Sequence, residues 1–184
     1  PNSNASRGSI DQLIDLAKKE GLNNNFFEAI RLYSLAIKKN NERNDNSYTL
    51  AWFLRGKLNL KIKKYRDAKY DLGICISICQ ENMEPLHKAI HKPLFKSVFL
   101  RCIANLILND EAYYNDLVYI QKSQSYRHLF FIRGLSYSLK NQTQKALEEF
   151  EKVIKISPSF FRDNDCLIVH IPEELKAIFN LYSL

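Results

Sequence analysis

The sequence has few of the residues that interrupt helices, with only 5 glycines and 5 prolines among 184 residues. Long segments in which apolar residues recur at the helical period, together with this scarcity, argue against an all-β fold. No apolar run approaches the roughly 20 residues that a membrane-spanning helix needs. We therefore expect an all-α, soluble chain without membrane insertion.

Cysteine is also scarce, and no two of the four cysteines, Cys75, Cys79, Cys102 and Cys166, form a Cys-x-x-Cys pair. Three of them fall in segments with helical periodicity, where we expect buried, reduced thiols. A Cys75–Cys79 redox pair on one helical face is the alternative. A reducing compartment fits this usage best, so we predict an intracellular, cytoplasmic protein, and a nuclear location is not excluded.

Motifs for catalysis are lacking: there is no Gly-rich phosphate loop, no Gly-x-Ser-x-Gly and no His-Glu-x-x-His. His87 and His91 stand four residues apart, but two histidines without an acidic or cysteine partner make a poor metal site. We expect Glu148 and Glu149 on the solvated outer face of a helix. The sequence thus predicts no enzyme activity, no cofactor and no metal.

What the sequence does contain is a recurring pattern of small residues. In the segment 50–79, Ala68 follows Gly56 at an interval of twelve residues. The same interval joins Ala17 to Ala29 and Gly134 to Ala146. Small residues at such positions let two helix backbones approach closely, so each copy predicts two helices folded back on each other.

A recurring tetrapeptide adds a further copy. Phe-Leu-Arg-Gly at 53–56 returns as Phe-Leu-Arg-Cys at 99–102 and as Phe-Ile-Arg-Gly at 131–134. The second occurrence indicates the first helix of another pair, whose second helix, near 112–122, lacks the alanine. We predict three clear repeats and one degenerate repeat, at residues 10–39, 48–80, 94–122 and 126–157.

This pattern resembles the tetratricopeptide repeat family, whose helix–turn–helix unit places aromatic residues, a Leu-Gly pair, alanines and a proline at set positions. The matching residues are Trp52, Gly56, Tyr65, Ala68, Phe130, Gly134, Tyr137, Ala146, Phe150 and Pro158. The resemblance covers residues 10–158 and implies an α-solenoid of repeats. The chain departs from the family in carrying Arg55 and Arg133 in place of the usual leucine.

The segments outside the repeats carry their own signals. We expect a flexible leader at 1–9, with Ser9 capping the first helix, and a short helical insertion bounded by Pro85 and Pro93. In the C-terminal capping segment, 159–184, a short extended run at 166–171 precedes a final helix that Pro172 opens. Repeat stacks need such an element to cover the last apolar face. The candidate covering residues are Leu175, Ile178, Phe179 and Tyr182.

The family resemblance further implies a concave groove lined by the first helix of each repeat. The predicted partner-contacting residues are Phe53, Lys57, Lys61, Lys96, Phe99, Ile103, His128 and Phe131. Packing between neighbouring helices is the alternative for the phenylalanines. The positions that match the carboxylate clamp of co-chaperone members lack its asparagines and arginine, so we expect weak or no binding of a chaperone's C-terminal tail.

The charge is positive, at +7, and is concentrated in one part of the chain. The basic residues of this part are Arg55, Lys57, Lys61, Lys63, Lys64, Arg66, Lys69, Lys88, Lys92, Lys96 and Arg101. An acidic protein segment or a nucleic-acid backbone would be attracted to them. We predict a non-enzymatic adaptor that binds an extended or helical protein segment with apolar and acidic residues. RNA binding through the basic face is the alternative.

Overall fold

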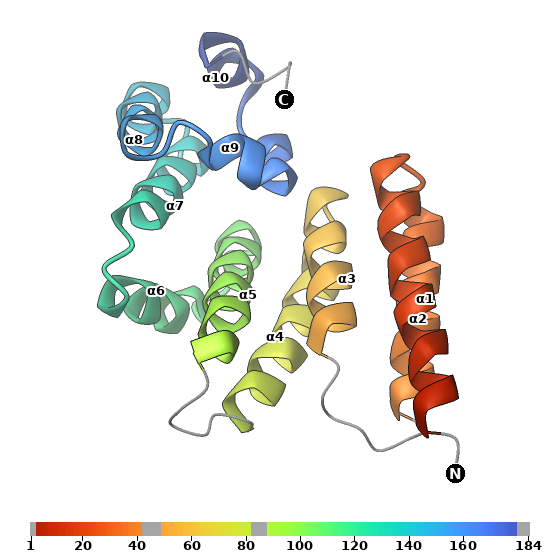
Figure 1. Cartoon of the computed structure of the whole chain (residues 1–184). Helices are drawn as coiled ribbons and strands as arrows, with labels where there is room; N and C mark the ends of the chain where they lie inside the picture. The colour runs from red at the N-terminus through yellow and green to blue at the C-terminus, as the bar shows by residue number, and fades with distance from the viewer. Residues whose placement is uncertain (1–2, 42–48, 82–87, 180–184) are drawn as a thin grey trace. The chain divides into compact units, whose positions relative to one another are not determined.

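A computed structural model describes residues 3–41, 49–81 and 88–179 (Figure 1). Side chains are described for residues 9–41, 49–81 and 93–179. These residues form α-helices and one 3-10 helix and contain no β-strand, which confirms the predicted all-α class. Within the same ranges, no helix combines the length and the apolar character needed to span a bilayer.

The helices follow one another with short connections. Their bounds are α1 (Ser3–Leu22), α2 (Phe26–Asn41), α3 (Thr49–Lys61), α4 (Tyr65–Glu81), α5 (Lys88–Ile107), α6 (Tyr113–Lys122), α7 (Tyr126–Leu139), α8 (Thr143–Ile156), α9 (Phe160–Asp163), η1 (Asp165–His170) and α10 (Glu173–Ile178). The chain divides into two compact units, 1–97 and 98–184, and the division falls inside α5. The four predicted helix pairs correspond to α1/α2, α3/α4, α5/α6 and α7/α8.

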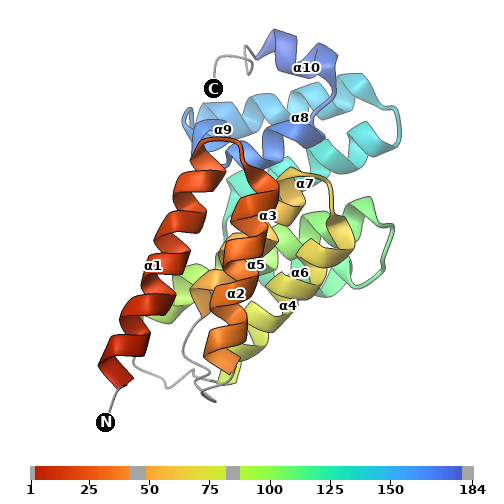
Figure 2. The same cartoon turned by 90° about the vertical axis from the view of Figure 1, so that its right-hand side faces the viewer.

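Unit 1 contains two helical hairpins, α1/α2 and α3/α4, and α2 lies beside α3 (Figures 1 and 2). Its first core cluster consists of Ile10, Ile14, Ala17, Ala29, Leu32, Tyr33, Ala36, Ile37 and Ala51. Leu54 and Leu58 of α3 pack against this cluster. One side of α3 therefore holds the second hairpin against the first by burying apolar area.

Unit 2 is built around a group of contacting rings. Its members are Phe99, His128, Phe131, Phe150, Phe160, Phe161 and Phe179. Phe131 of α7 is central, because its ring centroid lies 6.0 Å from that of Phe99 and 5.6 Å from that of Phe150. The C-terminal segment contributes Phe160, Phe161 and Phe179, so this part of the chain completes the core of unit 2.

The recurring small residues allow close helix approach, as the sequence predicts. A Cβ atom added to Gly56 would lie 2.9 Å from Cγ of Leu72, and one added to Gly134 would lie 2.7 Å from Cε1 of Phe150. Real Cβ atoms do not come so close to other heavy atoms. Ala17 and Cys102, at the corresponding positions of the other hairpins, are fully buried.

All four hairpins turn in the same way. The residue seven positions after each small anchor has a positive φ: Asn24 (62°), Lys63 (63°), Asn109 (54°) and Asn141 (57°). The next residue donates its backbone N–H to a carbonyl five residues earlier, as in Lys64 to Asn59 at 2.8 Å. This is the Schellman arrangement, which satisfies carbonyls at a helix C-terminus. Asparagine tolerates the left-handed conformation well, whereas lysine does not.

Lys63→Gly is therefore expected to stabilise unit 1 by about 0.5–1 kcal/mol, because glycine adopts the positive φ without steric cost. Lys63→Ile should destabilise it, since a β-branched side chain is strained there. Chemical denaturation followed by the fluorescence of Trp52, which lies in α3 of the same unit, measures both changes. Lys64→Gly is the matched control and should not stabilise; a gain there equal to that of Lys63→Gly would contradict the explanation.

The third hairpin differs in register, which explains why its repeat looks degenerate. Tyr113 and Tyr114 donate their backbone N–H groups to carbonyls only three residues earlier, at 3.1 and 3.0 Å. Such a 3-10 turn advances the chain with fewer residues per turn than an α-helix. The small anchor Cys102 lies with its Sγ 3.7 Å from the backbone oxygen of Tyr113, and the residue twelve positions after it is Tyr114 in place of an alanine.

Several predicted boundaries are wrong. Helix α1 begins at Ser3, so most of the expected leader and the expected cap Ser9 are helical, because extending a formed helix costs little. Helix α5 runs through Pro93, which loses one backbone hydrogen bond but does not end the helix. Residues 165–170 form a 3-10 helix in place of the expected extended run.

The predicted final helix is present as α10, which begins after Pro172. Its Leu175 is fully buried, and the ring of Phe179 contacts that of Phe150 at 6.5 Å. Ile178 is 60% exposed, so it does not contribute to this cover. Tyr182 and Pro85 lie outside the described residues.

Candidate functional site

The structure separates the predicted partner-contacting residues into two groups. Phe53, Lys57 and Lys61 of α3 are partly exposed, and Lys96 of α5 is exposed. The other four, Phe99, Ile103, His128 and Phe131, are buried. Buried side chains have no surface to offer a partner, so these four do not belong to a contact surface. Phe99 and Phe131 pack against each other, which is the alternative that the sequence left open.

The accessible face of α3 is a stripe of four residues, which we call the α3 stripe: Leu50, Phe53, Lys57 and Lys61. Their spacing of three or four residues places them along one side of the helix. Leu50 is 43% exposed, and the other three are partly exposed. Lys61 places its ammonium 5.4 Å from the ring centroid of Phe26. The stripe thus has an apolar end and a basic end.

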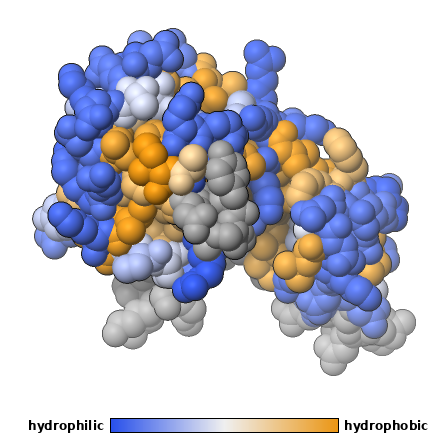
Figure 3. Space-filling view, turned by 90° about the horizontal axis from the view of Figure 1, so that it is seen from above, coloured by the Kyte–Doolittle hydropathy of each residue, from blue (hydrophilic) through white to orange (hydrophobic). Residues whose placement is uncertain are grey.

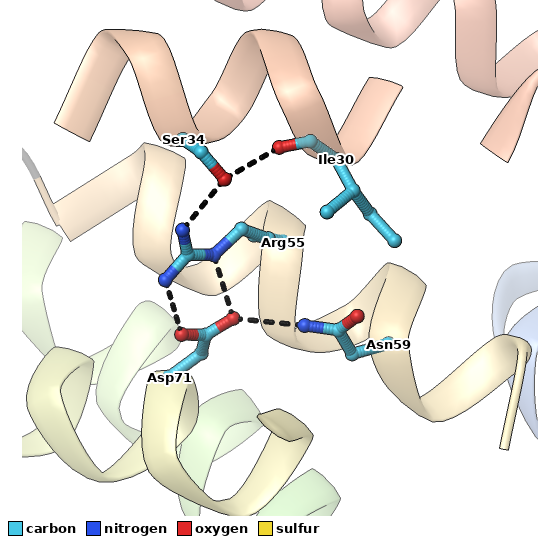
Figure 4. A network of polar contacts seen from close by, with 5 residues as sticks. All are labelled: Ile30, Ser34, Arg55, Asn59 and Asp71. Carbon is cyan, nitrogen blue, oxygen red and sulfur yellow. Dashed lines mark hydrogen bonds and ion pairs between the residues drawn. The ribbon is translucent and has the colours of Figure 1, made fainter. Parts of the chain in front are cut away.

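Arg55, which precedes the anchor Gly56 on the same helix, points into the hairpin and not along the stripe (Figure 4). Its Nε and Nη2 donate to the two carboxylate oxygens of Asp71 at 2.9 and 2.7 Å, and Nη1 donates to Oγ of Ser34 at 2.8 Å. Asn59 donates to the same carboxylate at 3.1 Å. This network links α3 to both α4 and α2.

The same interaction occurs in two further hairpins. Arg101 donates to both carboxylate oxygens of Asp116, at 3.2 and 2.7 Å, and Asn105 again adds a hydrogen bond. Arg133 donates twice to one carboxylate oxygen of Glu149, at 2.9 and 2.7 Å. We call these three pairs the hairpin braces.

The first hairpin has no brace, because Leu16 and Leu32 stand at the equivalent positions. The recurring arginine of the tetrapeptide is therefore a structural residue that joins the two helices of a hairpin. Glu149, predicted on the outer face, is instead a buried brace acid with 7% exposure.

The brace acids differ in their proton affinity. Burial raises the pKa of Asp71, and the hydrogen bonds from Arg55 and Asn59 only partly oppose this effect. Burial also acts to raise the pKa of Glu149, but hydrogen bonds from Lys152 and Arg133 outweigh it and lower the pKa from its ordinary value of 4.5. The carboxylates of all three acids accept hydrogen bonds from their arginines, so each joins the two helices of its hairpin.

The lowered pKa of Glu149 predicts how the stability of unit 2 depends on pH. Its ionised form is favoured by folding, so the stabilisation is present above pH 4.5 and is lost as the pH falls through the lower folded-state pKa. Urea denaturation at a series of acidic pH values should show this loss. Glu149→Gln should have a flatter acid limb than the parent. An unchanged acid limb would mean that Glu149 does not contribute to it.

The cysteines are all free and buried. Burial raises the pKa of Cys75 to about 12, and it also raises the pKa of Cys79. Ser97 donates a hydrogen bond to Sγ of Cys75 at 3.2 Å. The two thiols lie within hydrogen-bonding reach of each other. Thiols with a raised pKa stay protonated near neutral pH and are poor nucleophiles, however, so their burial does not favour the redox alternative.

Ligands for a metal do not gather in the described parts of the chain: no three His, Cys, Asp or Glu side chains there are placed to hold an ion. His87 and the side chain of His91 lie outside these parts. Of the predicted basic face, Arg55 and Arg101 are used in the hairpin braces, and the side chains of Lys88 and Lys92 are not described.

Comparison of the chain with protein-family models, with curated proteins and with solved structures gives no match. The tetratricopeptide resemblance therefore stays a prediction that rests on the residues quoted for it. Sequence reasoning missed the role of Asp71, Asp116 and Glu149 as the acids of the hairpin braces. A signal for them exists, since an acid follows each tetrapeptide arginine at 15 or 16 residues.

Proposed function

We propose that the chain is a non-enzymatic binding module that holds a segment of a partner protein against the α3 stripe. The observation that carries this proposal is that α3 leaves bulky apolar side chains accessible next to lysines. Leu54 and Leu58 pack against the core, whereas the adjoining stripe leaves Leu50 43% exposed and Phe53 partly exposed beside lysines. Partly exposed bulky side chains beside charges are typical of protein contact sites.

The partner segment should be apolar at one end and acidic at the other. Leu50 and Phe53 would bury an aliphatic or aromatic residue, and Lys57 and Lys61 would attract carboxylates about one or two helical turns away. An amphipathic helix or an extended strand could present such a pair of features. In this proposal the hairpins form an α-solenoid of tetratricopeptide type, and the braces keep α3 rigid for binding.

A peptide-display selection on the purified chain tests the proposal, because a random library samples many candidate partner segments at once. Enriched peptides should combine a bulky apolar residue with acidic residues, and a synthetic copy should bind in fluorescence anisotropy. Phe53→Ser and Lys57→Glu should each weaken that binding by about tenfold, the effect of losing about 1.4 kcal/mol. Tyr126→Ser and Lys38→Glu, which change exposed residues elsewhere, are the matched controls.

Unchanged affinity in both stripe variants would remove α3 as the binding face. Enrichment of peptides without acidic residues would remove the role of the lysines. The circular dichroism of every variant should match that of the parent, so that a loss of binding is not a loss of folding.

RNA binding is the second candidate, and one observation favours it. In unit 1, two lysines of neighbouring positions lie over aromatic rings, Lys61 over Phe26 and Lys64 over Phe27, each at 5.4 Å. Single-stranded nucleic acid combines stacking on rings with phosphate contacts to such lysines. Titration of a labelled oligonucleotide at several salt concentrations decides the matter. A dissociation constant of about 10⁻⁴–10⁻⁶ M at physiological salt would indicate non-specific backbone attraction alone.

A further inference from the structure

The two most exposed large apolar side chains among the described residues lie at the turn of the first hairpin. Leu22, the last residue of α1, is 84% exposed, and Phe27, in the first turn of α2, is 74% exposed. Neither packs into a core or a groove. Because three residues separate the two helices here, both side chains project from one end of the hairpin.

Lysines surround this end. Lys64, just after the turn of the second hairpin, places its ammonium 5.4 Å from the ring centroid of Phe27. Lys63 is exposed in the same turn, and Lys19 is exposed in the last turn of α1. We call these three lysines with Leu22 and Phe27 the unit 1 tip. The turns of both hairpins point to the same end of unit 1 (Figures 1 and 2).

Two acidic side chains lie three residues from the turn: Glu20 accepts a hydrogen bond from Nδ2 of Asn25 at 2.7 Å, and Glu28 forms an ion pair with Arg31 at 2.7 Å. Asp67, exposed in the first turn of α4, is a further acid close in sequence to Lys64. With Glu28 paired to Arg31, the three lysines and the exposed Arg66 outnumber Glu20 and Asp67, so the tip stays positively charged. Apolar and hydrophilic surfaces also lie next to each other on the face seen from above in Figure 3. The tip therefore combines protruding apolar groups with a surplus of positive charge.

The other hairpins do not repeat this combination. The position of Leu22 is taken by Lys61 in the second hairpin and by Leu139 in the fourth, and the position of Phe27 is taken by Arg66 and Gln144. The turn geometry is the same in all of them, as the positive φ values show. The apolar pair is therefore a property of the first hairpin's residues and is not required by the turn.

We propose that the unit 1 tip binds the surface of a membrane that contains anionic lipids, a role beyond the proposed partner binding. Leu22 and Phe27 would enter the boundary between headgroups and acyl chains, and the lysines would lie at the level of the phosphates. A protruding pair suits a deformable lipid phase, whereas a folded partner needs a matching pocket. Apolar insertion and attraction of lysines to anionic lipid act together in surface-bound proteins.

The contact between Lys64 and Phe27 fits this arrangement. With the ring at the acyl boundary, an ammonium 5.4 Å from its centroid can still reach the phosphate region. Only the side chains of Leu22 and Phe27 would enter the lipid, a contact much shallower than the insertion of a helix, and no helix among the described residues could span a bilayer.

Flotation of the whole chain with vesicles tests the proposal. Vesicles of phosphatidylcholine and phosphatidylserine in a 3:1 ratio should bind the chain, and vesicles of phosphatidylcholine alone should bind it at least tenfold more weakly. Leu22→Ser/Phe27→Ser should lower partitioning into the anionic vesicles at least tenfold. Leu139→Ser, which changes an exposed leucine at the equivalent position of another hairpin, should leave partitioning unchanged.

Insertion has a second readout. In Phe27→Trp, brominated lipid should quench the added fluorescence, whereas the parent, whose single tryptophan is Trp52, should be quenched much less. Equal partitioning of the parent and the double serine variant would overturn the proposal, since the attraction would then come from net charge alone. Loss of binding to a labelled oligonucleotide in that variant, with vesicle binding intact, would also overturn it and would assign the tip to nucleic acid.

Discussion

Replacing Asp71 with alanine is expected to destabilise unit 1 by about 3–5 kcal/mol, the cost of breaking a buried ion pair by removing one partner. Asp71 is 1% exposed and accepts hydrogen bonds from Arg55 and Asn59. Its removal leaves a partly buried guanidinium and a buried amide without their acceptor. Trp52 is a suitable probe because its ring lies 4.9 Å from the guanidinium carbon of Arg55.

The first hairpin provides the control for this experiment. It carries Leu16 and Leu32 where the second hairpin carries Arg55 and Asp71, and it folds with the same turn. Arg55→Leu/Asp71→Leu should therefore be close to neutral, or more stable by about 1–4 kcal/mol, since apolar replacements of buried ion pairs often are. The raised pKa of Asp71 supports the same expectation of little or no loss of stability, because burial disfavours the charged form of this carboxyl.

Denaturation in urea, followed by both tryptophan fluorescence and circular dichroism, separates unit 1 from unit 2. If Asp71→Ala lowers the free energy of unfolding by less than about 1 kcal/mol, the brace contributes as little to stability as an ion pair on the surface. If the double leucine variant is as unstable as Asp71→Ala, the brace is needed for a reason other than charge compensation.

The spacing of small residues is enough to predict the helical hairpins, because two helices can approach closely only where small residues stand at matching positions. Gly56, Gly134 and Cys102 all occupy tight places between helices. The tetrapeptide arginine stands out in the sequence only as a departure from a family pattern, although it forms the brace. Its partner acid lies 15 or 16 residues away on another helix, and a pairing between helices has no local period to reveal it.

The binding residues are harder to predict than the fold. Phe53 and Phe99 occupy the same position of the tetrapeptide, yet Phe53 is partly exposed and Phe99 is 2% exposed. The ring of Phe99 is covered by those of His128, Phe131 and Phe160, with centroids 4.5, 6.0 and 6.3 Å away, and Phe160 belongs to the C-terminal segment outside the repeats. Packing by a residue so distant along the chain cannot be inferred from a repeat pattern.

Phe150→Ala is expected to destabilise unit 2 by about 3–5 kcal/mol, since it removes a fully buried ring from a packed cluster. The ring contacts Phe131, Phe161 and Phe179, with centroids 5.6, 6.2 and 6.5 Å away. A cavity would remain among these rigid neighbours. Urea denaturation followed by circular dichroism measures the loss; a change below about 1 kcal/mol would mean that the site collapses without cost.

The same contact explains the glycine at position 134. In Gly134→Ala the new Cβ would approach ring atoms of Phe150 at 2.7 and 2.8 Å, and the surrounding rings leave little room to move. Overpacking of this kind costs about 1–3 kcal/mol, partly offset by the roughly 1 kcal/mol that alanine gains over glycine in a helix. Gly134→Ala/Phe150→Leu should recover stability relative to the sum of the single changes, because a leucine side chain lacks the clashing ring atoms. Additive effects in this double-mutant cycle would show that the two residues do not constrain each other.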